Sequence, residues 1–224
     1  MKKKHKKFNV LRFITFIILL IITYFIISYL FNIKTKNIII IGNEYYNDET
    51  IIETANIENY PNFITLNKSK IKRKLNNLEL IEEVQINKKY NFTIEINIKE
   101  KDILYLVRST NKYKLSTKED ISLDNISGIP TLINYVPEEK EEKLIERFAK
   151  INKNIRNKIS EIEYNKISYD DERFLLYMND GNEVYITLSK IDSLNKYNEI
   201  VKKLEEKKGI LYLDSGNYFE IKEK

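Results

Sequence analysis

The residue types that perform most enzyme chemistry are scarce in this sequence. Its 224 residues include no cysteine and a single histidine, His5, which lies in a basic stretch at the start of the chain. Without cysteine there is no thiolate nucleophile or thiolate metal ligand, and one histidine outside the folded part excludes histidine-based zinc sites and catalytic triads. The five glycines are dispersed and form no phosphate-binding loop. We therefore expect no metal site and no cofactor.

Serine and carboxylate residues leave one enzymatic alternative open. Ser215 follows Asp214 in an Asp-Ser-Gly step and could act with a lysine, although the step lacks the flanking glycines of a nucleophile elbow. Adjacent glutamates at 82–83, 138–139 and 141–142 could perform acid–base chemistry, but they occur among lysines, as on solvated surfaces. We expect no enzyme activity, no catalytic residue and no small-molecule substrate. The alternative is a membrane-anchored cell-envelope hydrolase with an unrecognised Ser/Lys or carboxylate site.

The basic charge of the chain is confined to its first residues. The formal net charge is +5, but residues 1–12 alone carry six lysines and arginines and no acidic residue. The rest of the chain is therefore slightly acidic. A domain that tracks phosphates needs a basic surface with interleaved aromatic residues, so we expect no nucleic-acid partner.

A strongly apolar segment follows the basic residues. Residues 13–33 read FITFIILLIITYFIISYLFNI and contain no charged side chain. About twenty such residues in a helix cross the hydrocarbon core of a bilayer, so we predict one transmembrane helix. A cleaved signal peptide is the alternative, but bulky residues at 29–33 stand where a cleavage site has small ones. Basic residues are more numerous before the helix than after it, which predicts a cytoplasmic tail (1–12) and a single-pass type II protein of the cell membrane.

The next 65 or so residues predict a small α+β domain. A β-branched run at 38–41 ends at Gly42-Asn43, and Asn47 or Asp48 can cap a helix that turns Ile51, Ile52 and Ala55 to one side. Asn67 can cap a second helix, with Ile71, Leu75 and Leu78 on one side. Apolar residues then alternate on both sides of a polar turn at 88–91, with Phe92 starting the second run, which predicts a hairpin. The predicted order is strand, helix, helix, strand, strand.

The remaining residues predict a mixed α/β domain. The expected elements are a hairpin over 103–117, a strand within 129–136, a helix over 137–155, a hairpin over 172–188 turning at 179–182, a helix over 189–208 with Gly209 as its C-cap, and two closing strands at 211–213 and 217–221. Chain ends usually fray, so a strand this close to the terminus suggests that something pairs with it. A free sheet edge there would offer a partner chain a template.

The sequence resembles the bacterial division proteins of the FtsQ/DivIB family in three segments that follow the apolar segment. In chain order these segments are NIIIIGNEYYNDETII, NFITLNKSKIKRKL and LIEEVQINKKYNFTIEINIKEKD. The chain departs from the family at 99–102, which reads Lys-Glu-Lys-Asp where the family usually has a glutamate followed by a proline. The resemblance implies an α+β protein with a POTRA domain (β-α-α-β-β) at 35–101. It also implies an FtsQ/DivIB-type domain at 102–224, whose antiparallel sheet ends in C-terminal strands.

The resemblance also implies a function, partners and a binding segment. FtsQ-like proteins are non-enzymatic scaffolds of the division septum that bind FtsB/DivIC-like and FtsL-like bitopic proteins and help recruit or regulate septal peptidoglycan synthases. Their C-terminal strands receive a strand from the FtsB/DivIC partner. We therefore expect the partner-binding residues to be Tyr212, Leu213, Asp214, Ser215, Gly216, Tyr218, Phe219 and Ile221.

Overall fold

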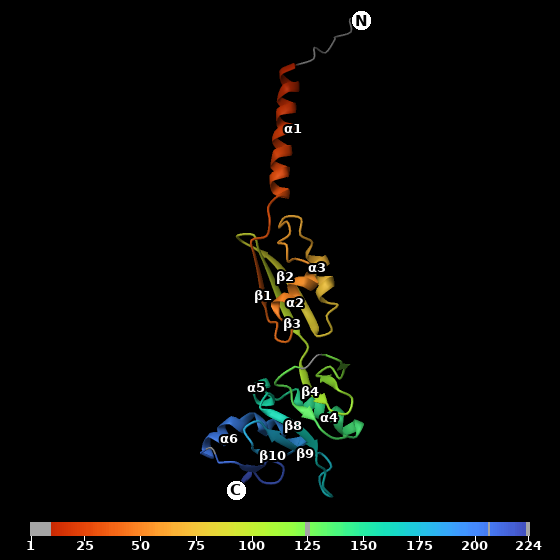
Figure 1. The fold of residues 1–224 in the computed structure, drawn as a ribbon, viewed down its shortest axis with the longest axis vertical. Helices are drawn as coiled ribbons and strands as arrows, with labels where there is room; N and C mark the ends of the chain where they lie inside the picture. The colour runs from red at the N-terminus through yellow and green to blue at the C-terminus, as the bar shows by residue number, and fades with distance from the viewer. Residues whose placement is uncertain (1–9, 124–125, 206, 223–224) are drawn as a thin grey trace, which may run out of the picture. The chain divides into compact units, whose positions relative to one another are not determined.

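The computed structural model describes residues 10–123, 126–205 and 207–222, and the chain forms two compact units, Met1–Glu100 and Lys101–Lys224 (Figure 1). The predicted cytoplasmic tail, including His5, lies mostly outside the described residues. The α+β fold class is confirmed: an apolar N-terminal helix is followed by a β-α-α-β-β unit and by a sheet that ends in C-terminal strands.

The first helix, α1 (Val10–Phe31), is the one described helix long and apolar enough to cross a membrane. Its 22 residues rise about 33 Å at 1.5 Å each, which matches a hydrocarbon core of about 30 Å. Its two threonines donate hydrogen bonds to backbone carbonyls of the same helix. The Thr15 hydroxyl donates to the Arg12 carbonyl (2.9 Å), and the Thr23 hydroxyl donates to the Leu20 carbonyl (2.8 Å). Helix α1 therefore has the length and composition of a membrane span near the N-terminus.

The three-stranded sheet of the first unit carries two helices on one face (Figure 1). Its strand order is β1-β3-β2, with β1 parallel and β2 antiparallel to β3. Alternate residues of β2 and β3 meet the apolar sides of the helices, so Val84, Ile94 and Ile96 are fully buried against Ile51 and Leu75. The elements are β1 (Asn37–Ile41), α2 (Asp48–Ala55), α3 (Lys68–Leu75), β2 (Ile81–Lys89) and β3 (Thr93–Glu100).

Two asparagines begin the helices of this unit. The Asn47 side chain accepts from the Thr50 N–H (2.8 Å), and the Asn67 side chain accepts from the Lys70 N–H (3.0 Å). Both predicted caps are therefore confirmed, with Asn47 and not Asp48 at the first.

Two details of the first unit differ from the predictions. α3 ends at Leu75, because Asn76 caps it, so Leu78 packs on the core from beyond the helix. Phe92 lies in the hairpin turn and not in a strand. Lys89 pairs with Thr93, and the backbone of Phe92 is left-handed (φ 55°).

The second unit contains a nine-stranded sheet in the order β12-β11-β10-β9-β8-β7-β4-β5-β6. The sheet is mixed and not purely antiparallel, since β10–β11, β4–β7 and β7–β8 are parallel pairs. Its strands are β4 (Ile103–Val107), β5 (Lys112–Leu115), β6 (Asp120–Ile121), β7 (Thr131–Leu132), β8 (Ile159–Tyr164), β9 (Arg173–Met178), β10 (Glu183–Thr187), β11 (Gly209–Tyr212) and β12 (Tyr218–Ile221).

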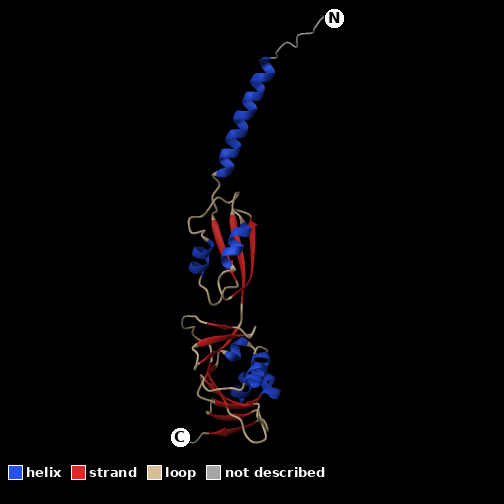
Figure 2. Ribbon diagram, turned by 90° about the vertical axis from the view of Figure 1, so that its right-hand side faces the viewer, coloured by secondary structure: helices blue, strands red, loops and turns tan. Residues whose placement is uncertain are grey.

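The helices of the second unit lie along one face of its sheet, where the core is formed (Figure 2). Phe148 of α4, Leu194 and Tyr197 are buried there against Phe174 and Leu211 of the strands. The helices are α4 (Glu138–Phe148), α5 (Lys153–Arg156), the 3₁₀-helix η1 (Leu188–Lys196) and α6 (Tyr197–Lys203).

Each of the two long helices predicted in this unit is divided. Residues 137–155 form α4 and α5, because Asn152 has an extended backbone (φ −53°, ψ 129°) between them. Pro137 is the N-cap of α4 and precedes its first turn. Residues 188–203 form η1 followed by α6. Serine, aspartate and asparagine residues, which compete for backbone hydrogen bonds, are frequent in η1.

One predicted cap and one strand need correction. Gly209 is not a helix C-cap, since it begins β11. Strand β8 was not predicted at all; it joins β7 to β9. The hairpins β4–β5 and β9–β10 are confirmed, and Gly181 has the left-handed backbone (φ 87°) that the second turn requires.

Candidate functional site at the C-terminal sheet edge

The last two strands extend the sheet beyond β10. After β10 the chain crosses over through η1 and α6, and β11 returns parallel to β10. β12 then pairs antiparallel with β11 and is the last strand in the described sheet order. One side of β12 is therefore an unpaired strand edge.

The hydrogen-bonding direction of β12 follows from its register. The Lys222 N–H donates to the Lys208 carbonyl (3.2 Å), and bonded pairs alternate with non-bonded pairs in an antiparallel ladder. Tyr218 and Glu220 thus bond to β11, whereas the N–H and C=O groups of Phe219 and Ile221 face the free edge. These outward groups are what an added strand would pair with.

Gly209 permits the close pairing of β11 and β12. A Cβ atom on Gly209 would lie 2.0 Å from the Glu220 carbonyl oxygen and 2.8 Å from the Phe219 ring. The Gly209 N–H faces the opposite way and donates to the Asn182 side chain (3.0 Å), which is itself buried in the turn between β9 and β10. The first residue of β11 is therefore tied to both neighbouring parts of the sheet.

The two faces of β12 differ. Phe219 packs against the core, and Leu211 and Leu213 are buried on the same side of the sheet. Tyr218 lies on the opposite face and is 51% exposed. Ile221 is 54% exposed, although strand alternation places it on the same face as Phe219.

Three tyrosines form a stacked ladder on the outer face, which we call the tyrosine ladder: Tyr185 on β10, Tyr212 on β11 and Tyr218 on β12. The ring centroids of Tyr185 and Tyr212 are 5.3 Å apart, and those of Tyr212 and Tyr218 are 4.4 Å apart with planes 12° from parallel. The Arg173 guanidinium covers the inner end, 3.7 Å from the Tyr185 ring centre. The outer end of the ladder is the half-exposed Tyr218 ring at the free edge.

The hydroxyl of the middle tyrosine is also held. Tyr212 donates to the Glu220 carboxylate (3.1 Å) across the β11–β12 pair. Burial, and then this hydrogen bond to a carboxylate, raises the pKa of Tyr212. The Tyr212 hydroxyl therefore stays protonated and keeps donating at neutral pH.

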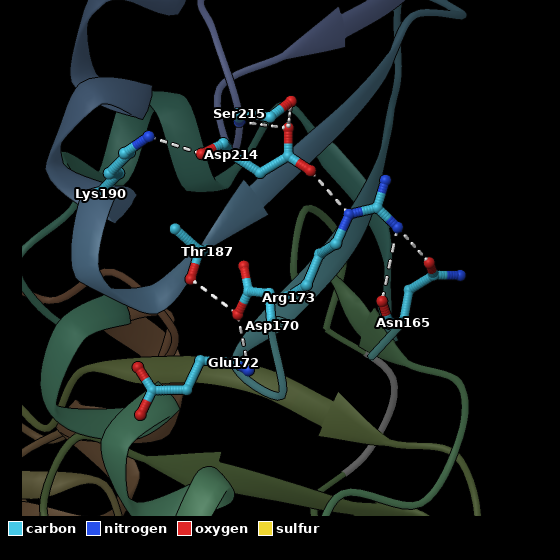
Figure 3. A network of polar contacts seen from close by, with 8 residues as sticks. All are labelled: Asn165, Asp170, Glu172, Arg173, Thr187, Lys190, Asp214 and Ser215. Carbon is cyan, nitrogen blue, oxygen red and sulfur yellow. Dashed lines mark hydrogen bonds and ion pairs between the residues drawn. The ribbon is translucent and has the colours of Figure 1, made fainter. Parts of the chain in front are cut away.

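An ion pair connects the turn before β12 to the middle of the sheet (Figure 3). Arg173 Nε donates to Asp214 Oδ2 (2.7 Å), and these side chains are 11% and 6% exposed. Arg173 also donates to Asn165 Oδ1 (2.6 Å), and Lys190 Nζ donates to the Asp214 carbonyl (2.5 Å). Ser215 donates to Asp214 Oδ1 through its N–H (2.7 Å) and its hydroxyl (3.0 Å).

The protonation of Asp214 reflects these contacts. Burial alone would raise its pKa, but the hydrogen bonds from Arg173 and Ser215 outweigh that effect and lower it. Asp214 is therefore ionised at neutral pH, and its charge fixes the turn that leads into β12.

The eight residues predicted to bind a partner do not form a single surface. Tyr218, Gly216 and Ile221 are exposed, and Tyr212 and Ser215 are accessible beside them. Leu213 is a core residue, with 2% exposure. Asp214 belongs to the ion pair, and Phe219 packs mainly inward.

Sequence reasoning missed Arg173 and Tyr185. Alternation within 173–178 and 183–187 assigns their faces, but no local signal shows that β11 lies beside β10.

Most of the side chains considered for catalysis have structural partners. The Ser215 hydroxyl donates to the Asp214 carboxylate, which is itself paired with Arg173, and the Lys190 ammonium donates to the Asp214 carbonyl. Glu82 pairs with Lys99, and Glu141 accepts from Tyr105.

Among the described residues, no group of three or more histidine, cysteine, aspartate or glutamate side chains could hold a metal ion. A hollow of about 380 Å³ adjoins Asp214, and its carboxylates Asp171 and Glu172 pair with Lys140 and Lys143.

Comparison with known proteins matches both units. A family model described as POTRA domain, FtsQ-type, matches residues 33–101. A second, described as cell division protein FtsQ/DivIB, C-terminal, matches residues 106–215. Together they cover well over half of the chain.

Curated relatives match nearly the full length. The cell division protein DivIB of Bacillus subtilis (strain 168) is 29% identical over 228 residues, which cover 98% of this chain and 87% of the relative. DivIB of Listeria monocytogenes serovar 1/2a is 26% identical, over 97% of this chain and 85% of the relative. The solved major extracytoplasmic domain of the trans isomer of DivIB from Geobacillus stearothermophilus is 22% identical, with a TM-score of 0.40, over 47% of this chain and 95% of that one.

Proposed function

Because the chain belongs to the FtsQ/DivIB family of bacterial cell division proteins, we propose that it is a non-enzymatic scaffold of the division machinery. Helix α1 anchors it, and the basic residues before α1 keep its N-terminus in the cytoplasm. Both folded units then act outside the cytoplasmic membrane, at the division septum. In this proposal the POTRA domain, residues 35–101, makes recruitment contacts, and the FtsQ/DivIB-type domain, residues 102–224, binds the partners.

The proposed partners are an FtsB/DivIC-like and an FtsL-like bitopic protein, through which the scaffold acts on septal peptidoglycan synthases. A strand of the FtsB/DivIC-like partner pairs with β12. The free N–H and C=O groups of Phe219 and Ile221 provide the backbone contacts, and this free edge is the observation that carries the proposal.

The tyrosine ladder gives the added strand its register. Tyr218 directs its own backbone groups to β11, so an antiparallel partner residue opposite it forms a non-hydrogen-bonded pair, in which side chains approach most closely. The exposed Tyr218 ring favours a planar side chain at that position, either aromatic or arginine. Ile221 supplies apolar area on the other face.

The experiment that tests this edge compares Ile221→Pro with Ile221→Ala in the full-length chain. Proline removes the outward N–H but is tolerated on the free side of an edge strand, and alanine removes the side chain alone. Binding to the DivIC-like protein of the same organism is measured in nanodiscs. We expect Ile221→Pro to weaken binding about tenfold more than Ile221→Ala, because a backbone hydrogen bond contributes about 1 kcal/mol and proline also blocks close approach.

The control is a Tyr135→Ala variant, which changes an exposed side chain of the second unit outside β11 and β12. It should bind the DivIC-like partner as the parent chain does. Equal binding by Ile221→Pro and Ile221→Ala, with both variants folded, would show that β12 does not pair with the partner.

Localisation tests the division role independently. A fluorescent protein is fused to the cytoplasmic tail and imaged in dividing cells of the source organism. We expect a midcell band that appears before constriction. A uniform membrane signal through the whole cycle would contradict the septal role and would leave the anchor and the fold intact.

A further inference from the structure

The end of the first unit where the chain enters β1 lies next to the exit of the membrane span. Ile33 follows α1 by two residues, and its carbonyl accepts from the Phe63 N–H (2.8 Å). The Thr35 N–H and hydroxyl both donate to the Pro61 carbonyl (3.0 and 2.8 Å). The loop before α3 is thus tied to the first residues after the span.

The turn of the β2–β3 hairpin lies at the same end of the sheet (Figure 1). The Lys36 N–H donates to the Phe92 carbonyl (2.9 Å). The rings of Phe63 and Phe92 meet edge to face at 5.5 Å, which joins the turn to the loop before α3. Because β1 and β3 are parallel and start together, Tyr90 in this turn cannot lie far from the chain exit.

This end of the unit exposes apolar and basic side chains together. We call it the membrane-proximal patch: Lys34, Lys36, Tyr60, Ile64, Lys68 and Tyr90. Tyr60 and Ile64 are 46% and 48% exposed, and Tyr90 is 96% exposed. None of the three lysines forms an ion pair with another residue in the described ranges. Tyrosine and lysine are the side chains that favour the polar layer of a bilayer.

The charge of the surrounding segments has one sign. Three segments contain the patch residues and the residues that contact them: 33–43, 59–78 and 84–94. Together they carry nine basic residues and no acidic one. Lys88 Nζ sits 5.3 Å from the Phe63 ring centre and donates to the Ile64 carbonyl (3.0 Å). Burial, and then repulsion from Lys68, lowers the pKa of Lys88, so an anion beside this pair would relieve the repulsion.

We propose that the membrane-proximal patch binds the headgroups of anionic phospholipids and holds the first unit against the outer surface of the bilayer. Chain continuity with α1 brings the patch to the headgroup layer, the lysines match its negative charge, and Tyr60, Ile64 and Tyr90 enter its apolar boundary. The inference concerns a surface other than β12, and it holds whether or not β12 binds a partner.

The absence of cysteine makes the test direct, since single cysteines can be labelled without removing others. The full-length chain carries one fluorophore at Ile64→Cys, at Tyr90→Cys or at the control position Tyr169→Cys, which is 85% exposed in the second unit. Each is placed in nanodiscs of phosphatidylcholine, or of equal parts phosphatidylcholine and phosphatidylglycerol. A lipid that carries a spin label on its headgroup quenches fluorophores near the surface.

We expect quenching at 64 and 90 to exceed that at 169, and to rise about twofold further in the anionic discs. At about 1 M salt, where screening acts over about 3 Å, this rise should disappear. The variant Lys34→Gln/Lys36→Gln/Lys68→Gln should also lose it. The matched control Lys112→Gln/Lys166→Gln/Lys196→Gln, which removes three exposed lysines of the second unit, should keep it.

Two results would overturn the proposal. One is quenching at 64 and 90 no stronger than at 169 in both lipid compositions, which would leave the patch free for a protein partner. The other is quenching at 64 and 90 that is equal in discs with and without anionic lipid, since the lysines would then have no role in the contact. The discs contain no division protein other than this chain, so a lipid effect cannot come from a division partner.

Discussion

Arg173 joins the outer face of the sheet to the turn that precedes its last strand. Its guanidinium bonds Asp214, reaches Asn165 and covers the ring of Tyr185, so one side chain supports both the tyrosine ladder and the entry into β12. Removing one partner of such a buried pair leaves the other charge without compensation. At the residue scale, the candidate site thus depends on a side chain that no partner strand would touch.

We expect Asp214→Ala to destabilise the second unit by about 3 kcal/mol, the range for breaking a buried pair. Chemical denaturation followed by circular dichroism measures the change. Asp192→Ala is the control, because Asp192 is exposed and has no ion pair with any described residue. A loss equal to that of the control would show that the Arg173–Asp214 pair adds nothing to stability.

The Asp214 carboxylate also makes stability depend on pH. Its pKa is below the ordinary value of 3.8 in the folded state, so its ionisation favours folding above that ordinary value. This contribution is lost as the pH falls through the lower, folded-state pKa. We expect the parent chain to lose more stability than Asp214→Asn between about pH 5 and pH 2. Parallel pH profiles for the two proteins in thermal unfolding would contradict this assignment.

At the scale of elements, β12 is attached to the sheet through one neighbour only. Its pairing with β11 depends on the absence of a side chain at Gly209, where an added Cβ would lie 2.0 Å from the Glu220 carbonyl oxygen. Backbone cannot move aside as a flexible side chain can. Because residue 209 is glycine, β12 can pair with β11 and form the edge of the sheet.

We expect Gly209→Ala to cost about 1 to 3 kcal/mol through overpacking and to detach β12 before the rest of the sheet. Hydrogen exchange should show lost protection at 218–221 with β8 to β10 unchanged. Gly216→Ala is the matched control, because its Cβ would meet only the movable Tyr218 ring, at 3.3 Å. Full protection of β12 in Gly209→Ala would refute the steric argument.

At the scale of the whole molecule, the two units have separate cores. Leu75 is fully buried among residues of the first unit, and Phe148 is fully buried among residues of the second. Large-to-small substitutions act on the core that contains them, and sites without shared partners contribute independently.

We expect Leu75→Ala and Phe148→Ala each to destabilise their own unit by about 3 to 4 kcal/mol and to leave the other unit unchanged. Hydrogen exchange on the full-length chain in nanodiscs reports both units in one experiment. If either substitution lowered protection in both units to the same degree, the units would fold as one cooperative body.

The sequence by itself determined the features that depend on neighbouring residues. The 21 residues 13–33, which include no charged side chain, specify a span. Asn47 and Asn67 specify helix starts, and alternation around 179–182 specifies a hairpin. These patterns, together with the segments that resemble one family, were sufficient to predict the α+β class and the order of helices and strands in the first unit. They were insufficient for Asn152 and η1, where the surrounding fold overrides helical spacing.

Only the tertiary structure decided the candidate site. Arg173 and Asp214 are 41 residues apart, and the tyrosine ladder draws on strands joined by a crossover. Which strands become neighbours depends on how the whole core packs, and the spacing of apolar residues within one segment does not predict it. The same holds for Gly209, which resembles a helix cap in sequence but in the folded chain begins β11, where a side chain would collide with the backbone of β12.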